Sequence, residues 1–349
     1  MRKNAYSYLG LIDRLVLPVL VLFLQLVGFA QNSSSESKFI LPNSKLAEVF
    51  SGGETFLEGP TMSGDGILFF SDIAFSFSPG MKAGIIWTFN PENKEAKVYR
   101  SPSGMSNGLI FDSNGDLIAC EGADFGGRKV TKTDIKTGKS IILASLYNGR
   151  PFNAPNDLAI DRQGRIYFTD PRYFGYEPIE QPVRGVYRID KDNSVHLVAA
   201  NIDQPNGIVV SPDQKTLYVA NCNLPGNGNS AFLPDDYKGV RPSGSGCVFA
   251  YNLLPDGSLQ LKGKVIDFAS ETCPDGMKID KEGNLYIALG DRVGIFSPDG
   301  KQIFEIKVPR ATNLCFGTGK YNRTLFIVGD RSIYTIETTK EGYNVIEAH

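Results

Sequence analysis

The chain has 349 residues, of which 42% are hydrophobic and 21% charged, a composition typical of a folded globular protein. Its formal net charge is -2 and it contains no basic tract, which excludes nucleic acid as an expected partner. The 37 Gly and 20 Pro residues, with 22 Phe and 15 Tyr, favour many short strands and turns.

The first 30 residues have the layout of a secretory signal peptide. Basic residues flank an apolar run over residues 15–27, and small residues ending at Ala30 precede a polar stretch. The run has 13 residues, fewer than the roughly 20 that a membrane-spanning helix needs, so stable membrane insertion is not expected. We therefore predict a signal peptide over residues 1–30, a flexible segment over residues 31–47, and a secreted or periplasmic protein.

A segment with a period of about fifty residues recurs along the rest of the chain. Each copy has two short runs of alternating apolar residues joined by a turn such as SNG or KEG, which predicts a β-hairpin. Two further strand-like runs lie between copies, and four strands per period are typical of a propeller blade. Residues 48–349 are thus predicted to form an all-β, six-bladed β-propeller with four-stranded blades. A β-sandwich would lack the self-similarity, and the helical periodicity of an α/β fold is nearly absent.

The spacing of the copies points to one insertion. The copies begin at Glu58, Asn107, Asn156, Asn206, Asp275 and Asn313. The fourth and fifth starts are 69 residues apart, against 49 or 50 for the preceding pairs. The extra residues, roughly 221–246, are rich in Asn, Gly, Pro and Ser, and long loops of this kind are usually functional or disordered. We expect a flap over the mouth of the channel.

The residue that starts each copy carries a side-chain oxygen. The first strand of a propeller blade lines the central channel, so these six residues are expected to surround one axis. Taken singly, dipeptides such as Asn-Gly are ordinary turn sequences. Six in register indicate a site instead, because the carboxylates of Glu58 and Asp275 would repel each other without a cation. An all-oxygen site suits Ca²⁺, and Mg²⁺, Mn²⁺ or Zn²⁺ remain alternatives.

Other catalytic chemistries have little support in the sequence. The two histidines are His196, in a strand-like run, and the terminal His349, so a histidine metal site or general base is not expected. No GxSxG motif fits a serine nucleophile. The five cysteines are Cys120, Cys222, Cys247, Cys273 and Cys315. Their wide spacing matches no zinc motif, and we interpret most as small buried hydrophobic residues, with one disulfide among the middle three left open.

Four motifs together resemble the senescence-marker-protein/gluconolactonase family, also called regucalcin-like. They are Glu58-Gly-Pro, Pro155-Asn156-Asp157, Pro205-Asn206-Gly207 and Pro274-Asp275-Gly276, and the similarity spans about residues 48–336. The resemblance implies a six-bladed propeller with one or two cations in its channel and lactonase activity. It also implies a ligand set of Glu58, Asn156, Asn206 and Asp275. Asn107 would be an additional channel residue that faces substrate or water.

The sequence departs from the family pattern at one position. Animal members carry an Arg two residues before the Asn of the third-blade motif, where this chain has Ala154. Arg128 or Arg172 could replace it as a substrate-binding residue, although either could equally be a surface arginine or form a salt bridge.

The resemblance implies a mechanism in which Ca²⁺ polarises the carbonyl of a small-molecule lactone. Asp275 is the candidate acid/base residue, because it could contact both the metal and water, and Glu58 would be mainly a ligand. Two alternatives stay open: another metal-assisted hydrolysis in the same channel, such as phosphotriester cleavage, and a non-catalytic propeller that binds calcium or a ligand. We expect a monomer or a weak dimer.

Overall fold

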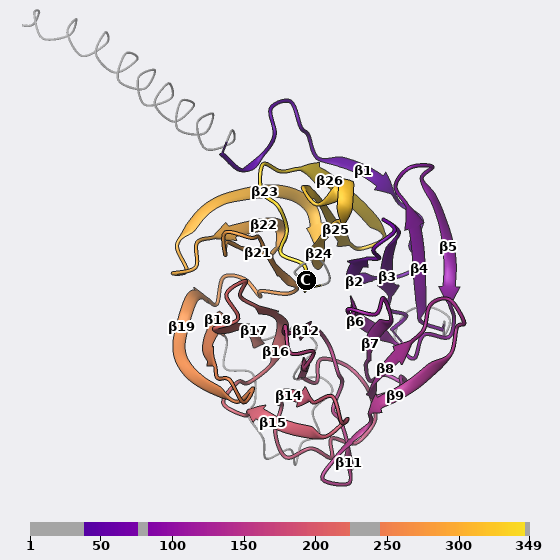
Figure 1. Ribbon diagram of the computed structural model, residues 1–349, viewed down its shortest axis with the longest axis vertical. Helices are drawn as coiled ribbons and strands as arrows, with labels where there is room; N and C mark the ends of the chain where they lie inside the picture. The colour runs from indigo at the N-terminus through magenta and orange to yellow at the C-terminus, as the bar shows by residue number, and fades with distance from the viewer. Residues whose placement is uncertain (1–37, 76–82, 224–244, 346–349) are drawn as a thin grey trace, which may run out of the picture.

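Six four-stranded antiparallel sheets are arranged as a closed ring around a central channel in the computed structural model (Figure 1), which describes residues 38–75, 83–223 and 245–345. The predicted six-bladed β-propeller is therefore confirmed. The signal peptide predicted over residues 1–30 and most of the flap predicted within residues 221–246 lie outside the described residues. Among the described residues, no helix is both long and apolar enough to cross a lipid bilayer.

The strands of each blade follow one another from the channel outwards. Blade 1 consists of β2 (Leu57–Met62), β3 (Leu68–Asp72), β4 (Ile85–Asn90) and β5 (Glu95–Arg100). Blade 2 consists of β6 (Ser106–Phe111), β7 (Leu117–Glu121), β8 (Lys129–Thr133) and β9 (Ser140–Ala144). Blade 3 consists of β12 (Leu158–Ile160), β13 (Ile166–Asp170), β14 (Gly185–Ile189) and β15 (Val195–Ala199).

The second half of the ring repeats this order. Blade 4 consists of β16 (Pro205–Val210), β17 (Thr216–Asn223), β18 (Ser245–Leu253) and β19 (Leu259–Ala269). Blade 5 consists of β20 (Met277–Ile279), β21 (Leu285–Ala288), β22 (Gly290–Phe296) and β23 (Gln302–Ala311). Blade 6 consists of β24 (Asn313–Phe316), β25 (Thr324–Gly329), β26 (Ser332–Glu337) and β1 (Ala47–Phe50). The remaining elements are the short hairpin β10 (Leu146–Tyr147) and β11 (Arg150–Pro151) and the 3-10 helix η1 (Gly319–Tyr321).

Blade 6 closes the ring because its outermost strand comes from the other end of the chain. Strand β1 pairs antiparallel with β26, and the preceding residues continue the contact through a bridge between Ile40 and Thr338. Phe39 is 2% exposed and packs in the core between blades 5 and 6. Within the segment predicted to be flexible over residues 31–47, the side chains of Phe39 and Ile40 are thus buried against the last blade.

The inner hairpins owe their turns to the sequence. In blade 2, Asp112 accepts hydrogen bonds from two main-chain N–H groups of the turn, and Gly115 has a φ of 79°. Asp280 in blade 5 also accepts two such bonds, and Asp161 in blade 3 accepts one, from the N–H of Arg165. A glycine is favoured at the positive φ, which explains why letters such as SNG, RQG and KEG predicted hairpins correctly.

The hydrophobic core is divided between the blades rather than placed in the channel. Six buried clusters each join two neighbouring blades, as where Phe70 of blade 1 and Phe326 of blade 6 share a cluster. Both faces of every sheet are thus covered by a neighbour. The channel remains free for the polar residues that begin the inner strands.

A disulfide joins blades 4 and 5. Cys222 in β17 is bonded to Cys273, which lies two residues before Asp275, with 4.8 Å between their Cα atoms. Cys120, Cys247 and Cys315 are free and buried, as expected for small hydrophobic residues. The disulfide therefore fixes the segment that leads into the inner strand of blade 5 to the neighbouring blade.

Candidate active site in the central channel

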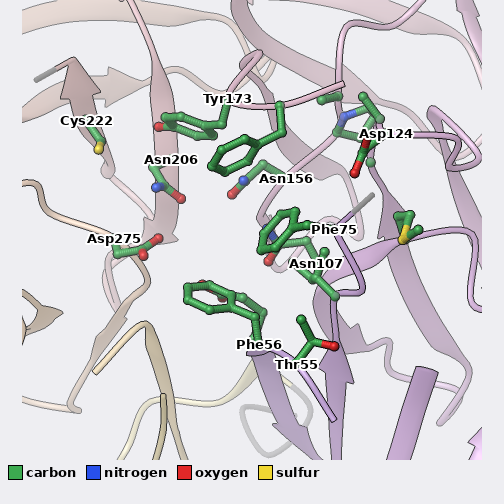
Figure 2. A pocket seen from close by; sticks show the side chains of 18 of the residues that line it. Thr55, Phe56, Phe75, Asn107, Asp124, Asn156, Tyr173, Asn206, Cys222 and Asp275 are labelled. Atoms are coloured by element: carbon green, nitrogen blue, oxygen red, sulfur yellow. The ribbon is translucent and has the colours of Figure 1, made fainter. Parts of the chain in front are cut away.

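The starts of the inner strands converge on one cavity of about 740 Å³ at one end of the channel. Its lining includes Glu58, Asn107, Asn156, Asn206 and Asp275, one from each of blades 1 to 5. Figure 2 shows four of these side chains around the cavity, with the oxygens of Asn206 and Asp275 on one side and Asn107 across from them. The structure thus brings together all four predicted metal ligands and the predicted channel residue.

Close packing of the inner strands explains the glycines that follow several of these residues. A Cβ atom added to Gly59 would lie 1.9 Å from the carbonyl oxygen of Asn107. One added to Gly207 would lie 2.3 Å from the carbonyl oxygen of Asp275. The glycines in the Glu-Gly and Asn-Gly dipeptides therefore serve the contact between neighbouring inner strands, which places the preceding side chain at the channel.

Each of three inner strands is anchored by a polar residue at the end of the second strand of its blade. These anchors, Asp72, Asp170 and Asn221, accept main-chain hydrogen bonds of 2.6 to 3.0 Å from the segment that enters the inner strand. The donors are Glu54, Thr55 and Phe56 to Asp72, Asn153 and Ala154 to Asp170, and Gln204 to Asn221. These three residues were not predicted from the sequence, although they occupy equivalent positions in the repeat, as the last residues of FFSD, YFTD and YVAN.

Hydrogen bonds between side chains hold the candidate ligands in place. Asn313, which does not line the cavity, donates from Nδ2 to Glu58 Oε2 at 3.1 Å. The hydroxyl of Tyr173 donates to the Gln204 carbonyl at 3.1 Å and is also hydrogen-bonded to Asn206. Asn206 in turn is hydrogen-bonded to Asp275. The sixth repeat start thus supports a ligand from behind instead of facing the cavity.

Burial raises the pKa values of the carboxyl groups in and beside the site. Glu58 is 3% exposed, and burial together with the nearby Asp275 carboxylate raises its pKa well above the usual range. Burial raises the pKa of Asp275 to about 7. Asp157 is a third carboxyl group beside them; it is 2% exposed, its pKa is raised by burial, and its Oδ2 atom has no hydrogen-bond partner. Such a concentration of buried acid groups is unfavourable unless protons or a cation offset it.

The donor set fits a divalent cation. Besides the two carboxylates and the Asn156 and Asn206 carboxamides, Asn107 presents a buried Oδ1 atom with no hydrogen-bond partner. Oxygen-only donors of this kind suit hard cations. In the part of the chain that the structure describes, no group of three His, Cys, Asp or Glu side chains could hold a metal ion. A cation in this cavity would therefore depend on the asparagine oxygens.

The structure places Arg128 and Arg172 away from the cavity lining. The Arg172 side chain is buried and bonded to the Glu177 carboxylate and to nearby carbonyls, at 3.0 to 3.2 Å. Arg128 pairs with Glu180 and with the Phe152 carbonyl. Both guanidinium groups hold the loop over residues 173–182, which argues against the substrate contact predicted for either arginine. His196 lies half-exposed on the outer strand β15, as predicted.

An arginine that sequence reasoning missed does line the cavity. Arg310, near the end of β23, lies with its guanidinium 5.7 Å from the centre of the Phe56 ring and forms an ion pair of 3.3 Å with Asp330. Arg310 lies on the outermost strand of blade 5, and the repeat predicts channel residues only for the innermost strands.

The fold and this site define a class: a six-bladed β-propeller with an oxygen-lined candidate cation site at one end of its channel. The chain belongs to the SMP-30/gluconolactonase/LRE-like family, whose characteristic region matches residues 56–226 and 231–330. The family predicted from the four motifs is therefore confirmed.

Several known proteins are similar to this chain. The gluconolactonase of Zymomonas mobilis is 29% identical over 340 residues, which cover 90% of this chain and 88% of that protein. Lactonase drp35 of Staphylococcus aureus is 29% identical over 262 residues, covering 72% and 70%. Among solved structures, a gluconolactonase from Xanthomonas campestris has a TM-score of 0.70 and 26% identity, over 86% of this chain and 91% of its own.

Proposed function

We propose that this protein hydrolyses lactones, and that Glu58, Asn156, Asn206 and Asp275 hold a divalent cation for this reaction. The observation that carries the proposal is the convergence of the buried Glu58 carboxylate, the partly buried Asp275 carboxylate and several carboxamide oxygens on one open cavity. The gluconolactonase and lactonase names of relatives that match over most of their length support the same reaction. Ca²⁺ is the favoured ion, with Mg²⁺, Mn²⁺ and Zn²⁺ as the alternatives to test.

The bound cation would supply Lewis-acid chemistry, drawing electron density from the lactone carbonyl and stabilising the oxyanion that forms on it. Glu58, held by Asn313, serves as a fixed ligand. Asn156 and Asn206 add oxygen donors without further negative charge, so two carboxylates balance a divalent ion. The unpartnered Oδ1 of Asn107 is available to accept a hydrogen bond from water or substrate.

Asp275 is the proposed acid/base residue. Its carboxylate can accept a proton from the attacking water and return it to the ring oxygen when the acyl C–O bond breaks. The product is the open-chain hydroxy acid. The Asp275 carboxylate is hydrogen-bonded to Asn206, and both side chains line the cavity.

We also propose that the protein acts outside the cytoplasm, secreted or in the periplasm. The signal-like sequence over residues 1–30 and the disulfide between Cys222 and Cys273 both support export to an oxidising compartment. Mass spectrometry of the protein recovered from cell fractions would test this, since cleavage after Ala30 and an extracytoplasmic location are expected together.

The exported protein, treated with EDTA and then supplied with Ca²⁺, tests the reaction. Proton release from glucono-δ-lactone and a panel of other lactones is expected to disappear with EDTA and return with Ca²⁺. Full turnover in EDTA, with no metal found by elemental analysis, would contradict the cation. No turnover of any lactone by cation-loaded protein would contradict the reaction, and phosphotriesters would then be the next substrates.

A further inference from the structure

The wall of the cavity above the candidate ligands is apolar. Phe56, Ile73, Phe75, Met105, Ala123 and Phe174 line it. Phe75 stands between the other two rings, 5.6 Å from the Phe56 centroid and 4.8 Å from the Phe174 centroid. Figure 2 shows Phe56 and Phe75 in the lining of the same cavity as Asn107 and Asp275.

Polar groups are few along this wall. Apart from the candidate ligands and Asn107, the described lining has four residues with polar side chains, Thr55, Asp124, Tyr173 and Arg310. The Tyr173 hydroxyl already donates to the Gln204 carbonyl. The guanidinium of Arg310 is already stacked on Phe56 and paired with Asp330. A polyhydroxylated ring would lose hydrogen bonds to water here without enough partners to replace them, whereas an alkyl or aryl group would gain by burial.

The size of the cavity agrees with a substrate that has more than a bare ring. About 740 Å³ lies within the range for pockets that enclose drug-sized ligands, roughly 300 to 1,000 Å³. With the lactone carbonyl at Asp275 and the candidate ligands, a substituent would extend along the apolar lining, which includes Phe56, Phe75 and Phe174.

We infer that the preferred substrate is a lactone with an apolar body, such as an alkyl or aryl substituent on the ring, in preference to a polyhydroxylated sugar lactone. This inference rests on the proposed lactone hydrolysis and specifies its substrate class. Phe56, Phe75 and Phe174, which we call the phenylalanine strip, hold the substituent and thereby place the carbonyl at the polar end of the cavity.

A series of δ-lactones with alkyl chains of increasing length tests the inference on cation-loaded protein. Each added methylene group that is buried is expected to raise kcat/KM by about fourfold until the wall is covered. δ-Decalactone should therefore exceed both δ-valerolactone and glucono-δ-lactone by at least tenfold. Equal kcat/KM along the series, or a preference for glucono-δ-lactone, would overturn the inference while the lactonase reaction stood.

The variant Phe75→Ser sharpens the test. It should lower kcat/KM for δ-decalactone about tenfold or more and lower kcat/KM for δ-valerolactone by a much smaller factor, because the alkyl substituent is the part proposed to pack against the Phe75 ring. Phe304→Ser is the matched control, since Phe304 is a similarly half-buried phenylalanine that packs against Phe39, far from the cavity. Phe75→Leu, which keeps an apolar side chain, should retain most of the preference and covers the case in which Phe75→Ser does not fold.

Binding separates a failure of this inference from a failure of the proposed function. The δ-lactams that correspond to δ-decalactone and glucono-δ-lactone can bind without being hydrolysed, and calorimetry measures both. Tighter binding of the alkyl lactam, with no lactone turned over, would support the apolar site and refute the reaction. Tighter binding of the polyhydroxy lactam would refute the apolar site regardless of turnover.

Discussion

The two ends of the central channel differ in chemistry although the same inner strands line both. At the open end the strands present carboxylates and carboxamides, as at Asn107 and Asn206. Two or three residues further along the same strands, Leu109, Ile110 and Ile208 line a second, small cavity of about 80 Å³ whose walls are mostly apolar. The polar character of the candidate site is thus a property of one position in each repeat and not of the channel as a whole.

The second end is closed by the last described part of the chain. A bridge joins Gly342 to Asp280, Tyr343 donates its N–H to the Ile279 carbonyl at 2.9 Å, and Val345 is buried among residues of blades 2 and 3. In Figure 1 this yellow segment runs back to the middle of the ring. Substitutions at the two ends should therefore separate catalysis from stability.

The largest expected effect is at the open end. Asp275→Asn should lower kcat for lactone hydrolysis by about a thousandfold, because it removes the proposed proton acceptor and one ligand charge. The fold should be retained, since a carboxamide has nearly the same shape, and circular dichroism checks this. Asp267→Asn on the outer strand β19 is the control and should keep full activity. Full activity of Asp275→Asn would remove this residue from the mechanism.

At the closed end the effect should fall on stability alone. Phe316 is 7% exposed, packs against Tyr286 with 5.0 Å between the ring centroids, and lines the small apolar cavity. Phe316→Ala should lower the free energy of unfolding by about 3 kcal/mol through lost burial and a cavity. Urea unfolding measures this, while kcat/KM at 25 °C should stay within about twofold because stability remains in excess. A large loss of activity in the folded variant would show that the two ends are coupled.

The open end also shows which features the sequence could predict. The repeat fixes the register of the inner strands, so Glu58, Asn156, Asn206 and Asp275 could be placed at the channel from spacing and family motifs. Contacts made by loops and outer strands have no such constraint. Arg172 was a candidate for either a substrate contact or a salt bridge, and the structure pairs it with Glu177 in its own loop.

Long-range pairing was equally inaccessible to the sequence patterns. The fourth strand of blade 6, β1, comes from the opposite end of the chain, and nothing local to residues 47–50 specifies its pairing with β26. The phenylalanine strip is similar, because Phe75 and Phe174 are brought together from loops of different blades. Both features depend on how the blades close into a ring. The repeat predicts that a ring forms, but it does not specify these individual contacts.

The smallest effect concerns the dependence of stability on pH and cation. The pKa of Asp275 is about 7 in the fold, against about 3.9 in an unfolded chain, and the pKa of Glu58 is raised as well. The cation-free fold therefore binds protons more tightly than the unfolded chain, and this stabilisation is complete below pH about 4 and is lost as pH rises through about 7.

Calcium should offset this loss of stability, because its positive charge would replace the protons that Glu58 and Asp275 release as the pH rises. In EDTA the midpoint of thermal unfolding should fall by a few degrees between slightly acid and slightly alkaline pH, and with saturating Ca²⁺ the fall should be smaller. Asp170, whose pKa burial also raises to about 7, lies outside the cavity lining and contributes equally under both conditions. The difference between the two pH profiles thus isolates the candidate ligands, and parallel profiles would mean that no cation binds at Glu58 and Asp275.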